Sequence, residues 1–196
     1  MSTKHRHRVG RGVHCAGKLA LTWGILQARA FDEHIASCGR VGGLHRAHGV
    51  IPNVDFAGGE PYEKTMYMLI DTADSKFHVG EKWSYHTRAG EEGSTLTIVK
   101  VEMMPGIGVI VHISLDGLRL RSLGSPGFLD FVAHIPFVES ALEMSVTTLV
   151  ASNAPIPDAC EEGYLEWRRD FDAGSAGFFT GPVTGVVDAI ERAMNQ

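Results

Sequence analysis

The strongest constraint on the fold is the alternation of apolar and polar residues between positions 77 and 122. A period of two is typical of β-strands with one buried face, and aromatic and β-branched residues such as Trp83, Tyr85 and Thr87 favour strands. The predicted strands cover residues 81–88, 94–103, 109–115 and 118–121. Short turn-forming segments separate them, so the stretch predicts a four-stranded antiparallel meander over residues 77–122.

The second predicted strand changes phase in its middle. Leu96 and Ile98 share one face, whereas Val99 and Val101 continue the apolar series one residue out of step. A strand changes face only through a local irregularity, so we expect a β-bulge near Ile98–Val99. The alternative is a strand buried on both faces at this point. Because bulges curl short sheets, four strands with one bend predict a small SH3-like partial barrel.

Glycine-containing pairs mark the predicted turns. Pro105–Gly106 fits a type II turn, and Asp116–Gly117 predicts a type I′ hairpin, because glycine tolerates positive φ at the required position. Residues 128–132 are expected to form a short apolar strand or turn. We expect Pro136 to end any extended run there and to precede a helix.

Three helices are expected after the meander, at about 138–152, 161–172 and 182–195. Their apolar residues recur close to every 3.6 positions, which favours amphipathic helices. We interpret the apolar stripes as core-facing, with a partner-binding groove as the alternative. Residues 66–196 are therefore predicted to form a single α+β domain.

Residues 1–65 differ in composition from the remainder of the chain. They hold nine Lys or Arg, five Asp or Glu and six of the ten histidines, whereas residues 66–196 hold nine Lys or Arg and eighteen Asp or Glu. Apolar periodicity is poor there. Three interpretations stay open: a poorly ordered appendage, a non-native segment translated from too early a start with Met66 or Met68 as the true beginning, or an Arg-rich targeting peptide.

Three sequence motifs occur in the later part of the chain, and their combination supports one resemblance. F-x-V-G-x-x-W-x-Y-x-T-R runs from Phe77 to Arg88, H-I-P-F covers 134–137 and E-G-Y-x-x-W covers 162–167. This combination resembles a group of small uncharacterised bacterial proteins over roughly residues 68–196. The resemblance implies no known activity, substrate or cofactor.

Composition disfavours several classes of function. An acidic body repels phosphates, so general nucleic-acid binding is not expected. No run approaches the roughly 20 apolar residues that a membrane-spanning helix needs. Cys15, Cys38 and Cys160 form no C-x-x-C, which argues against a disulfide framework and a zinc ribbon. We therefore expect a cytoplasmic protein without a metal or a cofactor.

Two hypotheses for function follow. The first is a non-enzymatic regulatory module that docks a protein or peptide, including a basic one, through Trp83, Tyr85 and Arg88. The second is a hydrolase- or transferase-like enzyme that uses His112 or His134 as general base and Arg88 as an anion anchor, which requires these groups to converge in one pocket. No nucleophile elbow, phosphate-binding loop or H-E-x-x-H motif occurs, which favours the first hypothesis. The sequence does not determine the oligomeric state.

Overall fold

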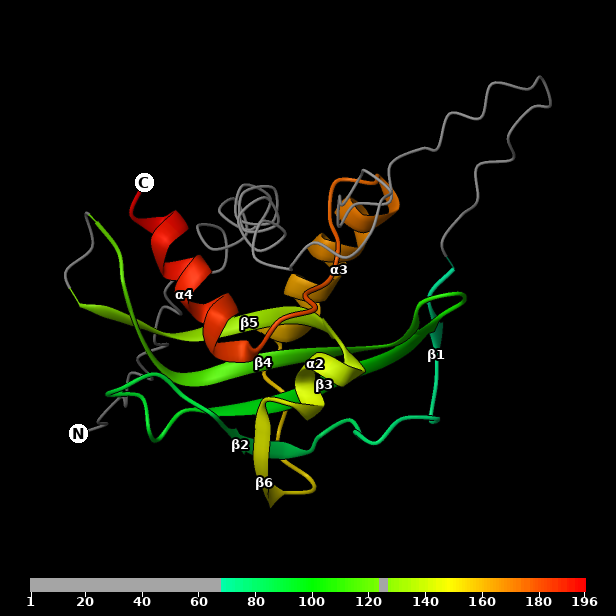
Figure 1. The fold of residues 1–196 in the computed structure, drawn as a ribbon. Coiled ribbons are helices and arrows are strands. Elements are labelled where there is room, and N and C mark those ends of the chain that lie inside the picture. Colours follow the sequence, from blue (N-terminus) through cyan, green and yellow to red (C-terminus); the bar gives the residue numbers. More distant parts are fainter. Residues whose placement is uncertain (1–67, 124–126) are drawn as a thin grey trace, which may run out of the picture.

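The computed structural model describes residues 68–123 and 127–196, which form an antiparallel sheet with helices on both faces, an α+β arrangement (Figure 1). The strands are β1 (Ile70–Asp71), β2 (Lys82–Tyr85), β3 (Thr95–Met104), β4 (Gly108–Arg121), β5 (Phe128–Val138) and β6 (Val146–Ala151). Their order is β5–β4–β3–β2–β6, and β1 pairs with β3. The sheet is open and does not close into the expected SH3-like barrel. The predicted N-terminal extension, 1–65, lies outside the described residues.

The expected bulge in β3 is confirmed. Ile98 pairs with Ile113 of β4 and Lys100 pairs with His112, so Val99 is an additional residue on β3. The insertion returns Val101 to the core that Ile98 occupies. An apolar phase change within one strand was therefore sufficient to locate this irregularity.

The Asp116–Gly117 hairpin prediction is wrong, because β4 continues through both residues as one strand. Gly117 has the expected positive φ of 78°, but it lies in an irregularity between Asp116 and Leu120, where β4 pairs with β5. The irregularity keeps Leu115 and Leu118 in the same core despite their odd spacing. A glycine with positive φ occurs in bulges as well as in tight turns. Pairing with the distant strand β5 makes this position a bulge.

The helix predicted over 138–152 is also wrong. Only α2 (Glu139–Glu143) is helical, and the chain then forms β6. The β-branched residues of the segment favour a strand once β2 offers a pairing partner. Pro136 likewise does not end the extended run, since β5 continues to Val138. A proline is tolerated there because β5 is an edge strand of the sheet.

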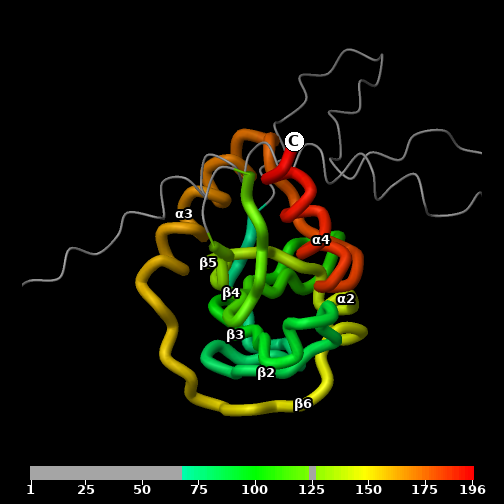
Figure 2. Tube along the Cα trace, turned by 90° about the vertical axis from the view of Figure 1, so that its left-hand side faces the viewer, coloured from blue at the N-terminus to red at the C-terminus, as the bar shows by residue number. Residues whose placement is uncertain are grey.

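The two later helices are confirmed as α3 (Ala159–Asp172) and α4 (Val183–Met194). In Figure 2 the sheet separates α3 from α2 and α4, and the chain passes beneath it from α2 through β6 to α3. The larger core includes Ile113 and Ile190, and a smaller one includes Ile110 and Trp167. None of the described helices is both long and apolar enough to span a membrane.

Candidate functional site

Three neighbouring strands place polar side chains beneath α3. Glu102 comes from β3, His112 from β4 and His134 from β5, and all three are buried. Ile113 pairs with Ile135 while Leu115 pairs with Val132, so two residues of β5 lie opposite one residue of β4. This bulge contains His134. The register of β4 and β5 thereby brings the two histidines together.

The two imidazole rings share one hydrogen bond. His112 Nδ1 lies 2.9 Å from His134 Nε2, and the rings are stacked with centroids 5.1 Å apart. Their exposed fractions are 0% and 4%. One nitrogen must donate and the other accept, so a single proton lies between the rings. Protonation of both nitrogens would break the contact.

Glu102 extends the pair toward α3. Its Oε2 lies 3.0 Å from His112 Nε2, and Tyr164 donates a hydrogen bond of 2.9 Å to its Oε1. Arg168 Nη1 lies 3.5 Å from the same Oε1. We call Glu102, His112, His134 and Tyr164 the buried histidine network.

Helix α3 closes this network from above. The Trp167 ring lies 4.8 Å from the His112 ring, and its Nε1 donates a hydrogen bond of 2.8 Å to the Gly177 carbonyl. At Gly163 a Cβ atom would lie only 2.9 Å from His134 Cβ, so glycine permits this close approach of helix and strand. The histidines are therefore enclosed by packed protein atoms on the helix side.

The environment sets the protonation states. Burial lowers the pKa of His112, and burial together with the neighbouring His112 ring lowers the pKa of His134 well below its usual value. Burial opposes ionisation of Glu102, yet the His112 ring, the Tyr164 hydroxyl and Lys100 hold the pKa of Glu102 below its usual range. Both imidazoles are thus neutral near pH 7.

This geometry favours a structural role for the histidines. A general base needs hydrogen-bond reach to a substrate, and neither ring is exposed. Within residues 68–123 and 127–196, no group of three or more His, Cys, Asp or Glu side chains is arranged to hold a metal ion. Cys160 is buried, and burial raises the pKa of its thiol, which disfavours a nucleophilic thiolate.

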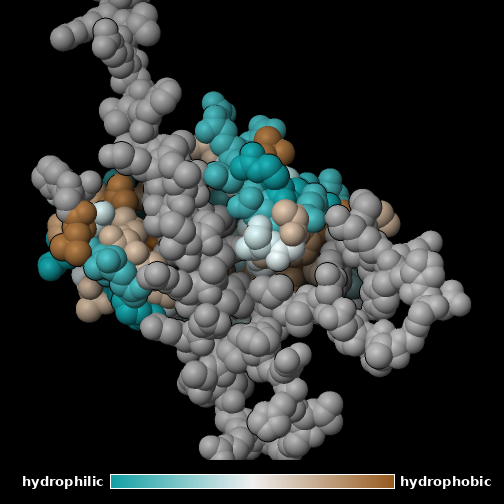
Figure 3. Space-filling view, turned by 90° about the horizontal axis from the view of Figure 1, so that it is seen from above, coloured by the Kyte–Doolittle hydropathy of each residue, from teal (hydrophilic) through white to brown (hydrophobic). Residues whose placement is uncertain are grey.

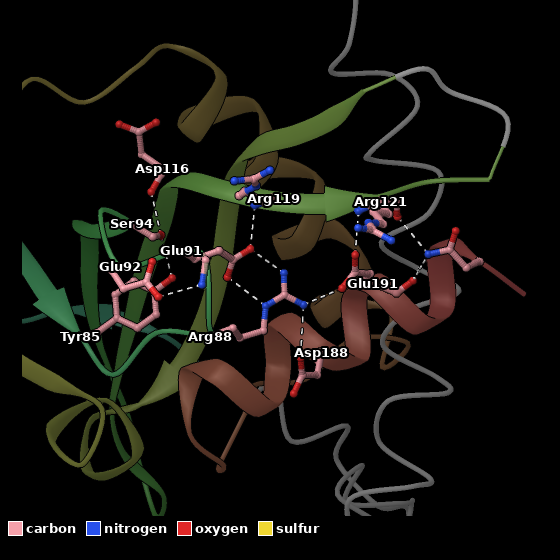
Figure 4. A network of polar contacts seen from close by, with 12 residues as sticks. Tyr85, Arg88, Glu91, Glu92, Ser94, Asp116, Arg119, Arg121, Asp188 and Glu191 are labelled. Carbon is pink, nitrogen blue, oxygen red and sulfur yellow. Dashed lines mark hydrogen bonds and ion pairs between the residues drawn. The ribbon is translucent and has the colours of Figure 1, made fainter.

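Arg88 belongs to a separate polar network, shown in Figure 4. Its guanidinium donates to both carboxylate oxygens of Glu91, at 2.9 and 2.5 Å, and to Glu191 of α4 at 2.6 Å. A further bond of 3.2 Å reaches Asp188. The Arg88 guanidinium already binds three carboxylates, whose negative charge exceeds its own positive charge. This environment would repel a further anion, which disfavours Arg88 as an anion anchor.

Replacing Arg88 by alanine should lower the free energy of unfolding by about 2 kcal/mol. Glu91 would lose the guanidinium that it pairs with while its own side chain is 2% exposed, and α4 would lose its ion pairs to the segment between β2 and β3. Urea unfolding at pH 7 measures the change. As a control, the exposed ion pair of Arg169 with Glu166 should contribute less than about 0.5 kcal/mol. Equal stability of R88A and the wild type would contradict the assigned role.

The remaining sequence candidates differ in exposure. Tyr85 is buried and its hydroxyl lies 2.8 Å from Ser94 Oγ. Trp83 is half-buried, packs edge-on against Phe77 and pairs in register with Leu149 of β6. Tyr85 also pairs with β6, at Val146, so of the two candidates beside this strand only Trp83 is partly exposed.

Exposed apolar side chains gather along β6 and its flanks. Leu149 is 41% and Val150 54% exposed. Val79 lies near the end of β6, because the adjacent Gly80 accepts a hydrogen bond from Ala154 N. We define the β6 surface as the exposed apolar residues Val79, Met144, Leu149, Val150 and Ile156. Figure 3, seen from above, shows hydrophilic and hydrophobic residues interspersed over the coloured part of that face.

Sequence reasoning selected both histidines but missed their partners. Glu102 interrupts an apolar series between Val101 and Met103, and this acidic residue in a predicted strand was an available signal. Tyr164 and Trp167 were recognised as part of an apolar stripe and of the E-G-Y-x-x-W motif, but not as neighbours of the histidines. The β6 surface was missed because Met144, Leu149 and Val150 were assigned to a helix over 138–152.

No protein-family model, curated protein or solved structure matches this chain.

Proposed function

We propose that this protein is a non-enzymatic binding module that accepts an extended segment of a protein partner along β6. A single observation carries the proposal: β6 is a sheet edge with exposed apolar side chains and no charge. Extended segments commonly bind by adding a strand to such an edge, with main-chain hydrogen bonds supplying affinity.

The two edges of the sheet differ in their protection. Along β5, Val138 N donates to the Phe179 carbonyl and Phe179 N donates to the Pro136 carbonyl, so a chain segment covers part of this edge. Among the described strands β6 pairs only with β2, and the chain carries no charged residue from Met144 to Pro157. Edge strands are usually protected by charges, prolines or covering segments.

Irregular pairing does not prevent β6 from accepting another strand. Thr147 and Val150 are additional residues of β6 relative to β2, and such bulges twist an edge. The strand β4 nevertheless pairs on both sides across similar irregularities. Strand addition along β6 is therefore compatible with the way this sheet is built.

The β6 surface also restricts the chemistry of the partner. A charged side chain placed against Leu149 or Val150 would lose hydration without gaining a counter-charge. Apolar and β-branched side chains would instead cover the exposed apolar area. The expected ligand is therefore an extended segment of about six residues without charges.

Displayed random decapeptides provide a direct test. We expect selection on the wild-type protein to enrich uncharged, β-branched sequences, and Val150→Lys to weaken binding of a selected peptide at least tenfold, as measured by fluorescence anisotropy. Leu165→Lys is the matched control, since Leu165 is 57% exposed on α3. Binding that survives V150K, or that L165K weakens equally, would overturn the proposal. Thermal melting of both variants checks that the fold is retained.

A further inference from the structure

We propose that Arg119, Arg121 and Phe128 form a second binding site, which takes a phosphorylated side chain of a partner protein. Both arginines come from β4, and Phe128, the first residue of β5, pairs in register with Arg121. The strand order places β5 at one edge of the sheet and β6 at the other. Binding at this site therefore does not involve the β6 surface and is independent of the function proposed above.

Two basic side chains of this acidic domain have no carboxylate partner. Residues 66–196 contain twice as many acidic as basic residues, so most basic side chains have an acidic neighbour. The ion pairs with carboxylates within residues 68–123 and 127–196 include those of Lys76, Lys82, Lys100, Arg88, Arg168 and Arg169. Arg119 and Arg121 are exposed and form no such pair with any residue that the structure describes. Their positive charges can therefore bind an anion from outside the domain.

Phe128 brings the two guanidinium groups together. The Cζ atoms of Arg119 and Arg121 lie 4.7 and 5.7 Å from the centroid of its ring. Cation–π attraction holds each guanidinium near the ring, whereas the two like charges repel each other. An anion bound by both groups would remove this repulsion, and a guanidinium over a ring still has N–H groups at its edge to donate. The cluster therefore suits a doubly charged anion with several acceptor oxygens.

The carboxylates nearest to this part of β4 belong to the Arg88 network. Glu91 and Glu191 accept hydrogen bonds from the backbone N atoms of Arg119 and Arg121, and both carboxylates also bind Arg88. The side chains of Arg119 and Arg121 alternate with two leucines that are buried in the larger core, which includes the apolar side of α4. Because side chains alternate between the faces of a strand, the two guanidinium groups lie on the other face.

The surroundings of the site favour an isolated dianion over a polyanion. Glu92 and Asp130 are exposed on the neighbouring segments, and the body of the protein is acidic. Nucleic acids and anionic membranes carry many phosphates, which this acidic body would repel. A phosphorylated serine instead carries nearly two negative charges and three acceptor oxygens on one side chain. Two guanidinium groups match this charge and can donate paired hydrogen bonds to its oxygens.

Fluorescence anisotropy of a short rhodamine-labelled peptide, built of glycine and alanine around one phosphoserine and titrated with the full chain, tests the site. We expect the same peptide with serine to bind at least tenfold more weakly. Arg119→Ala and Arg121→Ala should each weaken binding of the phosphopeptide at least fivefold, and Arg119→Lys should also weaken it, because lysine keeps the charge but loses the fork of donors. Arg169→Ala is the matched control, since it removes an exposed arginine elsewhere and should leave the affinity unchanged.

Phe128→Ala separates an organised cluster from charge alone. It keeps both arginines but removes the ring beneath them, so phosphopeptide binding should weaken about threefold. Wild-type affinity in F128A would overturn the role of the ring. Thermal melting checks that each variant retains its fold, as expected for exposed side chains.

The remaining outcomes test the site and the class of partner separately. Equal binding of the two peptides, or wild-type affinity in R119A and R121A, would overturn the site. Inorganic phosphate that binds as tightly as the phosphopeptide would overturn a protein partner. Single-stranded DNA or phosphatidylserine vesicles that bind more tightly than the phosphopeptide through the same arginines would overturn it as well.

Discussion

Replacing Trp167 by alanine should lower the free energy of unfolding by about 3 to 5 kcal/mol, the usual range for a fully buried aromatic side chain. Trp167 is completely buried, contacts the His112 and His134 rings and donates a hydrogen bond to the Gly177 carbonyl. Its removal would leave a cavity between α3 and the sheet. Urea unfolding at pH 7 measures the effect.

Two variants distinguish loss of packing from a general effect on α3. Trp167→Phe should cost less than alanine, because it retains part of the ring contact but removes the indole donor. Leu165→Ala, on the exposed side of the same helix, should change stability by less than about 0.5 kcal/mol. If W167A unfolded like the wild type, α3 would not be anchored as described.

Stability should also fall as the pH drops below about 6.5. The pKa values of His112 and His134 are lowered in the folded protein, chiefly by burial, whereas both rings regain their usual pKa of 6.5 on unfolding. Above that pH both states are neutral and stability is independent of these rings. Below it the unfolded chain binds protons that the folded chain does not, so acid favours unfolding. We expect a loss of roughly 1 to 3 kcal/mol per pH unit.

The titratable groups around the two rings change protonation outside the range between pH 6.5 and 5. Lys100 and Glu102 face them from β3, and Tyr164 and Arg168 approach from α3. The pKa of Glu102 is held below its usual value of 4.5, so its contribution to stability is lost only at lower pH. Burial, followed by the Glu102 carboxylate, raises the pKa of Tyr164 to about 12. Between pH 6.5 and 5 the expected slope therefore reports the histidine pair.

Urea unfolding at pH 5, 6, 7 and 8 tests this expectation. His134→Gln should be less stable than the wild type at pH 7 yet show a shallower slope below pH 6.5, because one buried imidazole is absent. Leu165→Ala, which changes an exposed side chain and no titratable group, should keep the wild-type slope. A flat wild-type profile, or a wild-type slope in H134Q, would contradict the assignment.

The local sequence pattern predicted the structure correctly where it was compatible with a single local conformation. The phase change at Ile98–Val99 predicted a bulge that the register of β3 and β4 confirms. The aromatic stripe of α3 and the aliphatic stripe of α4 predicted helices that the structure contains. Each of these signals lies within a few residues and needs no distant partner to be interpreted.

The local sequence pattern gave wrong predictions where a segment is compatible with two different secondary structures. Gly117 adopts the positive φ that its sequence predicts, but this conformation serves a bulge because β5 pairs alongside. The segment 146–151 combines near-helical apolar spacing with β-branched residues, and pairing with β2 makes it a strand. Edge strands of this kind depend on hydrogen bonds to a partner far away in sequence.

Some features of the candidate site could likewise be predicted from the sequence, and others depend on the tertiary structure. The sequence by itself determined the α+β class, the acidic body and the presence of His112 and His134 on predicted extended segments. Only the tertiary structure decided that a β5 bulge brings the histidines within hydrogen-bonding distance, that Glu102 lies against His112 and that α3 encloses them. It also decided that β6 is an edge. The reason is physical: side-chain periodicity specifies which face of an element is buried, whereas strand pairing specifies which residues meet on that face.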